Sequence, residues 1–115
     1  MLRNTTTTRT VLSFLAEHEL YTNYGLNIME ETGLVPGTVY PILQRLIREE
    51  LAVSQWEDID PSEEGRPARR LYNLTREGRE VNAEFRKAFA RRLGRSSERS
   101  REKIALLPNS PPQEA

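Results

Sequence analysis

The chain has no cysteine and only one histidine among its 115 residues. The absence of cysteine excludes disulfide bonds and thiolate metal sites. A zinc site needs several converging ligands, so we interpret His18, which stands between Glu17 and Glu19, as part of a solvated helix end. The chain also lacks a phosphate-binding loop and a nucleophile–base set. The sequence therefore predicts neither an enzyme nor a protein that carries a cofactor or metal.

Long apolar runs and a net charge are missing as well. No run approaches the roughly 20 apolar residues of a membrane span, and residues 1–10 lack the apolar stretch of a signal peptide. We therefore expect a cytoplasmic protein without a membrane partner. Residues 1–85 carry 9 basic and 14 acidic side chains, whereas residues 86–115 carry 8 and 3. Because the total charge is zero, any binding to phosphates must come from local arginines.

Two helices are predicted before residue 33. The first carries apolar residues at helical spacing over about residues 9–19. The second spans about residues 24–32, with Thr22 or Asn23 as its cap. Gly33 is well placed as the residue after this helix, where φ is often positive. Together with the helix that follows, these short elements predict a helix-turn-helix unit.

The third predicted helix has the clearest pattern. Its apolar stripe is Val39, Ile42, Leu43, Leu46 and Ile47. Pro41 has no N–H to donate, but it is harmless if Thr38 is the N-cap, because Pro41 then falls at the third helical position. The opposite face supplies the candidate DNA contacts Thr38, Tyr40, Pro41, Gln44, Arg45 and Arg48. Gln44 and Arg45 would reach base edges, and the helix N-terminus would meet phosphates. The alternative is an ordinary solvated face.

A hairpin is predicted directly after this helix. Residues 51–56 and 69–74 read as its strands, and the acidic segment 57–64 with its proline reads as a loop. A helix with a basic face followed by a ribbon with arginines is the layout of a winged helix, which presents the helix to the major groove and the ribbon to the neighbouring backbone. The candidate DNA contacts here are Arg66, Arg69, Arg70 and, at the second helix, Tyr24. The alternatives are charge balance for the arginines and packing for Tyr24.

A fourth helix is predicted from Thr75 to about Leu93, a length of about 28 Å at 1.5 Å per residue. A compact winged helix cannot cover such a helix, so its apolar stripe needs a second copy of the chain. The candidate dimer contacts are Val11, Leu12, Leu15, Val81, Phe85, Ala88, Phe89 and Leu93. The predicted fold is mainly α with a small β-hairpin: a winged helix-turn-helix over residues 1–74, a dimerisation helix over 75–94, and a basic, then proline-rich tail over 95–115, predicted to be disordered.

Three ordered segments add a family resemblance. They are Tyr24-Gly25-x-x-Ile28, Gly33-Leu34-x-Pro36-Gly37-Thr38-Val39-Tyr40-Pro41-x-Leu43-x-Arg45-Leu46, and Gly65-Arg66-Pro67-Ala68-Arg69-Arg70-x-Tyr72-x-Leu74-Thr75-x-x-Gly78. In order and spacing they resemble the PadR family of bacterial transcriptional regulators, in its small subgroup with one C-terminal helix, over about residues 9–93. The resemblance implies a homodimeric regulator, usually a repressor, that binds palindromic promoter sites. In some members a small molecule releases the DNA.

The chain departs from this family pattern at two places. Glu50 stands where family members usually carry glycine before the first wing strand. Either Glu50 takes a left-handed conformation or the turn differs. The only tryptophan is Trp56 in the wing strand, whereas some small members hold flat drugs between tryptophans of their C-terminal helices. Phe85 and Phe89 are the nearest substitutes, and we interpret them as dimer core.

These observations predict a sequence-specific DNA-binding regulator whose partners are double-stranded DNA and a second copy of the chain. A small-molecule effector remains an open part of this prediction. The alternative is a winged helix used as a protein-interaction module, which the zero net charge allows.

Overall fold

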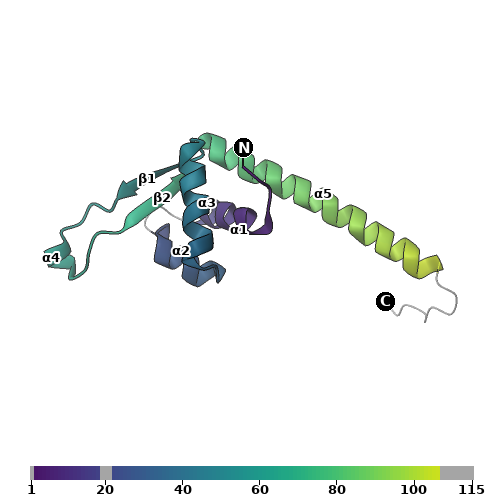
Figure 1. The fold of residues 1–115 in the computed structure, drawn as a ribbon, viewed down its shortest axis with the longest axis horizontal. Coiled ribbons are helices and arrows are strands. Elements are labelled where there is room, and N and C mark those ends of the chain that lie inside the picture. The colour runs from purple at the N-terminus through teal and green to yellow at the C-terminus, as the bar shows by residue number, and fades with distance from the viewer. Residues whose placement is uncertain (1, 19–21, 107–115) are drawn as a thin grey trace. The chain divides into compact units, whose positions relative to one another are not determined.

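The computed structural model describes residues 2–18 and 22–106, with side chains as far as residue 95. Its elements are α1 (Thr6–Glu17), α2 (Gly25–Thr32), α3 (Pro36–Arg48), β1 (Ala52–Trp56), α4 (Pro61–Glu64), β2 (Arg70–Leu74) and α5 (Arg76–Leu106) (Figure 1). The mainly helical fold with a small hairpin, predicted from the sequence, is confirmed. The chain divides into two compact units, Met1–Phe85 and Arg86–Ala115, and the division falls inside α5. Within the described residues, no helix is long and apolar enough to cross a membrane.

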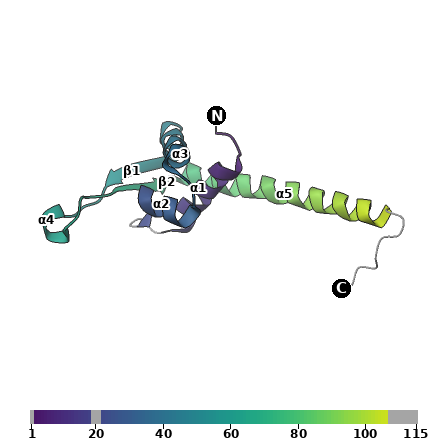
Figure 2. The ribbon, with the colours of Figure 1, turned by 60° about the horizontal axis from the view of Figure 1, so that its bottom comes forward.

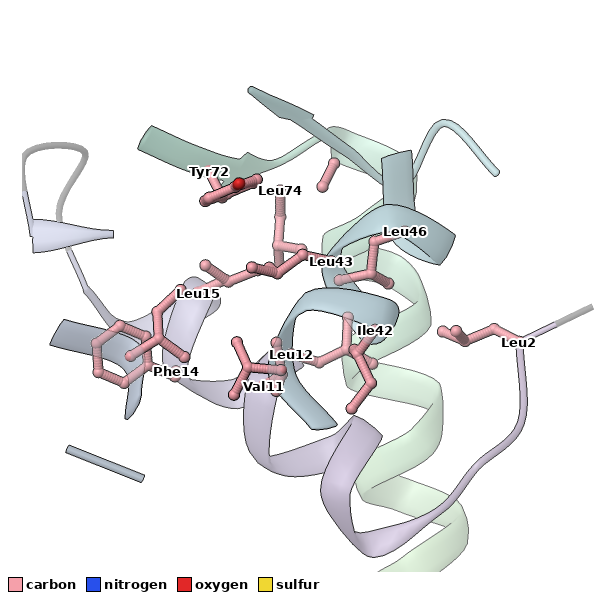
Figure 3. Close-up of a cluster of buried hydrophobic side chains, with 13 residues drawn as sticks. Leu2, Val11, Leu12, Phe14, Leu15, Ile42, Leu43, Leu46, Tyr72 and Leu74 are labelled. Atoms are coloured by element: carbon pink, nitrogen blue, oxygen red, sulfur yellow. The ribbon is translucent and has the colours of Figure 1, made fainter. Parts of the chain in front are cut away.

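One apolar core holds the first unit together. Side chains from α1, α3 and β2 point toward one another in it (Figure 3). Val11, Leu12 and Leu15 of α1 are completely buried within the single chain, and each such side chain stabilises the fold by about 1.5–3 kcal/mol. The sequence placed these three residues among the dimer contacts. The structure corrects that assignment, because fully buried side chains leave no surface for a second copy.

The helix-turn-helix unit begins with two differently capped helices. Thr5 caps α1 by accepting a hydrogen bond from the Thr8 N–H at 3.2 Å, so α1 starts before the predicted Arg9. Tyr24 is the N-cap of α2 but makes no side-chain cap. The predicted cap at Asn23 is therefore wrong: Asn23 is buried, and its Nδ2 lies 3.4 Å from the Leu15 carbonyl oxygen. The structure thus uses this amide to join the end of α1 to the start of α2.

Both ends of α3 depend on unusual residues. The helix begins at Pro36, with Val35 as its N-cap, so the prediction that Thr38 is the N-cap is wrong. Proline is favoured at the first helical position, where no N–H is needed, and this preference outweighs a threonine cap. Pro41 therefore lies inside the helix, where its missing N–H leaves the Gly37 carbonyl without the usual intrahelical bond.

At its C-terminus α3 closes with paired reverse hydrogen bonds. The Leu51 N–H donates to the Leu46 carbonyl at 2.8 Å, and the Glu50 N–H donates to the Ile47 carbonyl at 3.0 Å. This is the Schellman arrangement, whose turning residue is normally glycine. Glu50 adopts it with φ of 59°. Of the two alternatives for Glu50, the structure therefore selects the left-handed conformation.

The hairpin is antiparallel, with Ala52 opposite Leu74 and Trp56 opposite Arg70. Its tip is not the plain loop predicted from the sequence, because Pro61–Glu64 forms the single helical turn α4. Asp60 accepts a hydrogen bond from the Ser62 N–H at 2.9 Å, and Gly65 ends the turn with φ of 70°. An aspartate cap, a proline at the first position and a terminal glycine favour such a turn. α4 lies at the end of the hairpin away from α1, α2 and α3 (Figures 1 and 2).

α5 starts at a close contact with the α3–β1 turn. Thr75 caps α5 by accepting from the Gly78 N–H at 3.1 Å, and its own hydroxyl donates to the Glu50 carbonyl at 2.8 Å. The helix continues to Leu106, beyond the predicted end near Gly94. One glycine weakens a helix by only about 1 kcal/mol, and the surrounding arginines, lysines and glutamates favour helix. Of the predicted disordered tail, residues 107–115 lie outside the described part of the chain.

Candidate nucleic-acid interface

The polar face of α3 is open to solvent. Pro41, Gln44, Arg45 and Arg48 are exposed, and Tyr40 is 40% exposed. Thr38, the remaining predicted contact on this helix, is half-buried. The apolar stripe lies on the other side, where Val39, Ile42, Leu43 and Leu46 are buried in the core. The structure therefore presents all the polar residues predicted for this face on one surface.

Tyr40 also has a packing role that the sequence did not indicate. Its hydroxyl lies so close to Gly25, the first residue of α2, that a Cβ at Gly25 would overlap it. The absence of a side chain at Gly25 thus permits α3 and α2 to approach at this point. Tyr40 joins the two helices of the helix-turn-helix unit while two fifths of its surface faces solvent.

Two hairpin arginines are held by aromatic rings. The Arg69 guanidinium carbon lies 4.2 Å from the centre of the Tyr24 ring, and that of Arg70 lies 5.0 Å from the centre of the Trp56 ring. Arg70 also donates a hydrogen bond from Nη2 to the Ser54 hydroxyl at 2.8 Å. A cation stacked on an aromatic face is attracted by the electron-rich ring and keeps its charge. Both arginines are therefore held in place with their charges retained.

Tyr24 connects the start of α2 to the hairpin. It forms an isolated antiparallel bridge with Leu71 of β2. Next to it, the Tyr72 N–H donates a hydrogen bond to the Asn23 carbonyl at 2.8 Å. The sequence left open whether Tyr24 packs or contacts phosphate. In the structure it packs, and through its ring it places Arg69 beside the helix-turn-helix unit.

Arg66 is in a different situation from the other two hairpin arginines. Its Nη1 and Nη2 donate to the two carboxylate oxygens of Glu57 at 2.7 and 3.0 Å. This bidentate hydrogen bond lowers the pKa of the Glu57 carboxyl and raises the pKa of Arg66. The sequence allowed two interpretations of the hairpin arginines, contact with DNA or charge balance. The ion pair with Glu57 fits charge balance for Arg66. The sequence offers Glu57, together with the other acidic residues of the loop, as a partner for charge balance. It does not identify Ser54 as a partner of Arg70, although Ser54 lies in β1, the strand paired with β2, where such side-chain pairing is common.

The residues predicted to form the dimer separate into groups. Val81 and Phe85 are half-buried and pack against the core of the first unit. In the second unit Ala88 is half-buried, Phe89 is 36% exposed and Leu93 is 51% exposed. Among the side chains of α5 that the structure describes, the large apolar ones that are exposed are therefore Phe89 and Leu93.

Comparisons with solved structures show where this fold occurs. The chain is similar to a PadR-like transcription factor from Bacteroides fragilis, with 23% identity and a TM-score of 0.62 over 80% of this chain and 86% of that chain. It is similar to a mutant of ZitR from Lactococcus lactis, with 25% identity and a TM-score of 0.61 over 88% of this chain and 63%, less than two thirds, of that chain. A mutant of MepR from S. aureus bound to an oligodeoxyribonucleotide has 19% identity and a TM-score of 0.60, over 91% and 67%.

A search of curated proteins found no match. The family described as "Transcriptional regulator PadR-like family" matches residues 11–84. This match begins in α1, includes the helix-turn-helix unit and the hairpin, and ends in α5. It covers more than half of the chain and includes the exposed α3 face and the hairpin arginines. The chain therefore belongs to the PadR-like family of transcriptional regulators.

Proposed function

We propose that the protein binds promoter DNA in a sequence-specific manner and represses transcription as a homodimer on a palindromic site. The observation that carries this proposal is the exposed face of α3, which places Gln44 and Arg45 on a helix of the size that the major groove admits. Family membership supports the regulatory role. The oligodeoxyribonucleotide bound to MepR, which shares the fold, supports DNA as the ligand.

The residues of α3 divide into two kinds of contact. Gln44 is suited to a bidentate contact with adenine, and Arg45 to one with guanine, so these two residues read the sequence. Thr38, Tyr40 and Arg48 contact phosphates and thereby fix the register of the helix on the duplex. Pro41 presents an exposed apolar ring on the same face.

The hairpin supplies the second contact region. Arg69 and Arg70 keep their charges while they rest on Tyr24 and Trp56, and they contact the backbone beside the groove that α3 occupies. Arg66 is left out of this contact set because its guanidinium is bound to Glu57. Tyr24 acts by holding Arg69.

Dimerisation gives the site its symmetry. In a C₂ dimer of winged helices the two recognition helices lie about one DNA turn, roughly 34 Å, apart, which matches a palindrome. The exposed Leu93 and Phe89 of α5 are the contacts we assign to the second copy. A small-molecule effector would release the DNA only if it bound the free dimer more tightly than the DNA-bound one.

The test is a binding titration with DNA from upstream of the protein's own gene against a scrambled duplex, over a series of salt concentrations. Replacing Arg45 with alanine is expected to reduce specific affinity by about 10- to 100-fold and to relax the preference for guanine at one position. Arg76→Ala is the matched control, since Arg76 is an exposed arginine of α5 outside the proposed contact. Absence of binding even at low salt would favour the alternative, a protein-interaction module.

A further inference from the structure

We propose that Glu57 is a positioning residue for the hairpin, which latches the tip segment 57–66 and thereby sets the place of Arg69 against DNA. This inference rests on the proposed DNA binding. It also reassigns Arg66: the arginine acts through Glu57 and does not contact a phosphate. The term latch is used below for the Glu57 carboxylate together with its bonds to Arg66 and to the Arg69 backbone.

Glu57 makes bonds to both ends of the returning chain. Its Oε1 and Oε2 accept from Arg66 at 2.7 and 3.0 Å, and Oε1 also accepts from the Arg69 N–H at 3.2 Å. The Glu57 N–H donates to the Arg69 carbonyl at 2.8 Å. One residue therefore fixes both backbone groups of Arg69 and closes the tip through Arg66.

The Glu57 carboxylate is shielded from solvent, which favours keeping its hydrogen bonds to Arg66. The Glu57 side chain is only 7% exposed, against 30% for Arg66. A carboxylate so shielded is destabilising unless its charge is paired. If Arg66 turned its guanidinium to a phosphate, both oxygens of Glu57 would lose their main partner. The arrangement therefore favours keeping Arg66 on Glu57 when DNA binds.

The latch matters because the tip is strongly acidic. Asp58, Asp60, Glu63 and Glu64 are exposed there, and like charges repel the DNA backbone. Arg69 is the third residue after this tip segment, and its guanidinium lies over the Tyr24 ring. If the latch were lost, the acidic segment would move more freely and the backbone of Arg69 would no longer be set before binding. Affinity depends on such preorganisation, because ordering a loop on binding opposes association.

The test compares Glu57→Gln, Arg66→Gln and the double variant in DNA binding over a salt series. The latch predicts that each single variant loses affinity, by about threefold to tenfold, and that the double variant loses no more than either single one. The slope of affinity against salt stays unchanged, whereas loss of a phosphate contact would reduce it by about 1. Asp58→Asn is the matched control, because it removes the same charge from an exposed neighbour and is expected to bind slightly more tightly.

The sign of the Glu57→Gln effect decides between the two roles of Arg66. If Arg66 contacts phosphate and Glu57 merely competes for it, Glu57→Gln binds more tightly than Asp58→Asn, and the inference is overturned. A salt slope reduced in Arg66→Gln would overturn it as well. Arg66→Lys should recover only part of the affinity, since a lysine cannot form the bidentate pair.

A second readout separates this inference from the proposed function. Hydrogen exchange of the Arg69 amide, measured by NMR without DNA, should be faster in Glu57→Gln and unchanged in Asp58→Asn. If the amide is not protected in the unaltered protein, the latch itself is disproved whatever the DNA result. If it is protected but the unaltered protein binds no DNA, the proposed function fails and the positioning role fails with it, while the latch stands as a feature of the hairpin.

Discussion

Glu50 is, among the described residues other than glycine, the one with a positive φ. The left-handed region is unfavourable for residues with a Cβ, which comes too close to the backbone carbonyl. Glu50 is nevertheless fixed there by the reverse hydrogen bonds that end α3 and by its carbonyl, which accepts from the Thr75 hydroxyl. The turn between α3 and β1 is thus maintained by its surroundings against the local preference of its residue.

Replacing Glu50 with glycine is expected to stabilise the protein. Glycine removes the left-handed strain, and part of this gain is lost to the greater freedom of glycine in the unfolded chain. The free energy of unfolding should rise by about 0.5–1 kcal/mol, measured by urea denaturation. Arg48→Gly is the control, since Arg48 lies in α3 and glycine there should lower stability by about 1 kcal/mol. A lower stability for Glu50→Gly would show that the glutamate side chain itself stabilises the turn.

The Glu57–Arg66 pair makes a pH-dependent contribution to stability. Arg66 lowers the pKa of Glu57 from its ordinary value of 4.5. A carboxyl whose pKa is lowered by folding contributes stability above its unfolded pKa, and that contribution is lost as the pH falls through the lowered folded pKa. Arg66→Gln should therefore be less stable than the unaltered protein at neutral pH, and the difference should shrink as the pH falls below 4.5.

Urea denaturation of both proteins from neutral pH to about pH 3 checks this expectation. Arg76→Gln is the control, because the Arg76–Glu80 pair has both side chains largely exposed and such pairs contribute little. A stability difference for Arg66→Gln that stays constant over the whole range would mean that Glu57 does not titrate with a lowered pKa.

At the scale of elements, the start of α5 is fixed by a close approach to the turn after α3. A Cβ at Gly78 would overlap the Leu51 carbonyl oxygen, a backbone atom that cannot move aside alone. Gly78→Ala should therefore lower the free energy of unfolding by about 1–3 kcal/mol. Gly37→Ala in α3 is the matched control, because a Cβ there meets open space and alanine favours helix by about 0.5–1 kcal/mol. If the two variants changed stability equally in thermal denaturation, α5 would not pack closely against the Leu51 carbonyl oxygen.

Local patterns predicted the elements well where one signal dominates. The apolar stripe of α3, from Val39 to Leu46, was correctly assigned to the core because its spacing fits only a helix face. Gly33 was correctly expected to adopt a positive φ, which is 75°. The start of α3 was misplaced because two start signals compete there: Pro36 as first residue and Thr38 as cap. Local sequence alone does not rank them.

At the candidate site, contacts between residues far apart in the sequence could not be predicted from local sequence patterns. The exposed side of α3 follows from its pattern, whereas the pairing of Glu57 with Arg66 depends on the single turn of α4 that brings the chain back. The burial of Val11, Leu12 and Leu15 likewise depends on α3 and β2 lying over α1 (Figure 3). An apolar stripe predicts that a helix face is covered, and it does not say whether the same chain or a second copy covers it.

At the scale of the whole molecule, charge is divided unequally between the two units. Residues 1–85 contain the proposed DNA-binding face and carry more acidic than basic side chains, whereas residues 86–115 are basic. DNA binding by the first unit therefore depends on a few placed arginines rather than on its overall field. With so few contacts in one chain, the homodimer proposed above would bind DNA far more tightly than a single chain, because it links two half-site contacts.

Leu93 provides the test of this dependence. A leucine buried in an interface contributes about 1.5–3 kcal/mol, and C₂ symmetry counts it in both copies. Leu93→Asp should therefore raise the dimer dissociation constant by about 100-fold or more, measured by sedimentation equilibrium. Ala90→Asp is the matched control, since it adds the same charge at an exposed position of α5 away from the apolar stripe. In DNA titrations Leu93→Asp should lose affinity for a full palindrome and keep that of the unaltered protein for an isolated half-site. If Leu93→Asp sediments as the unaltered protein does, the dimer is formed by another surface, and the assignment of this helix to dimerisation is wrong.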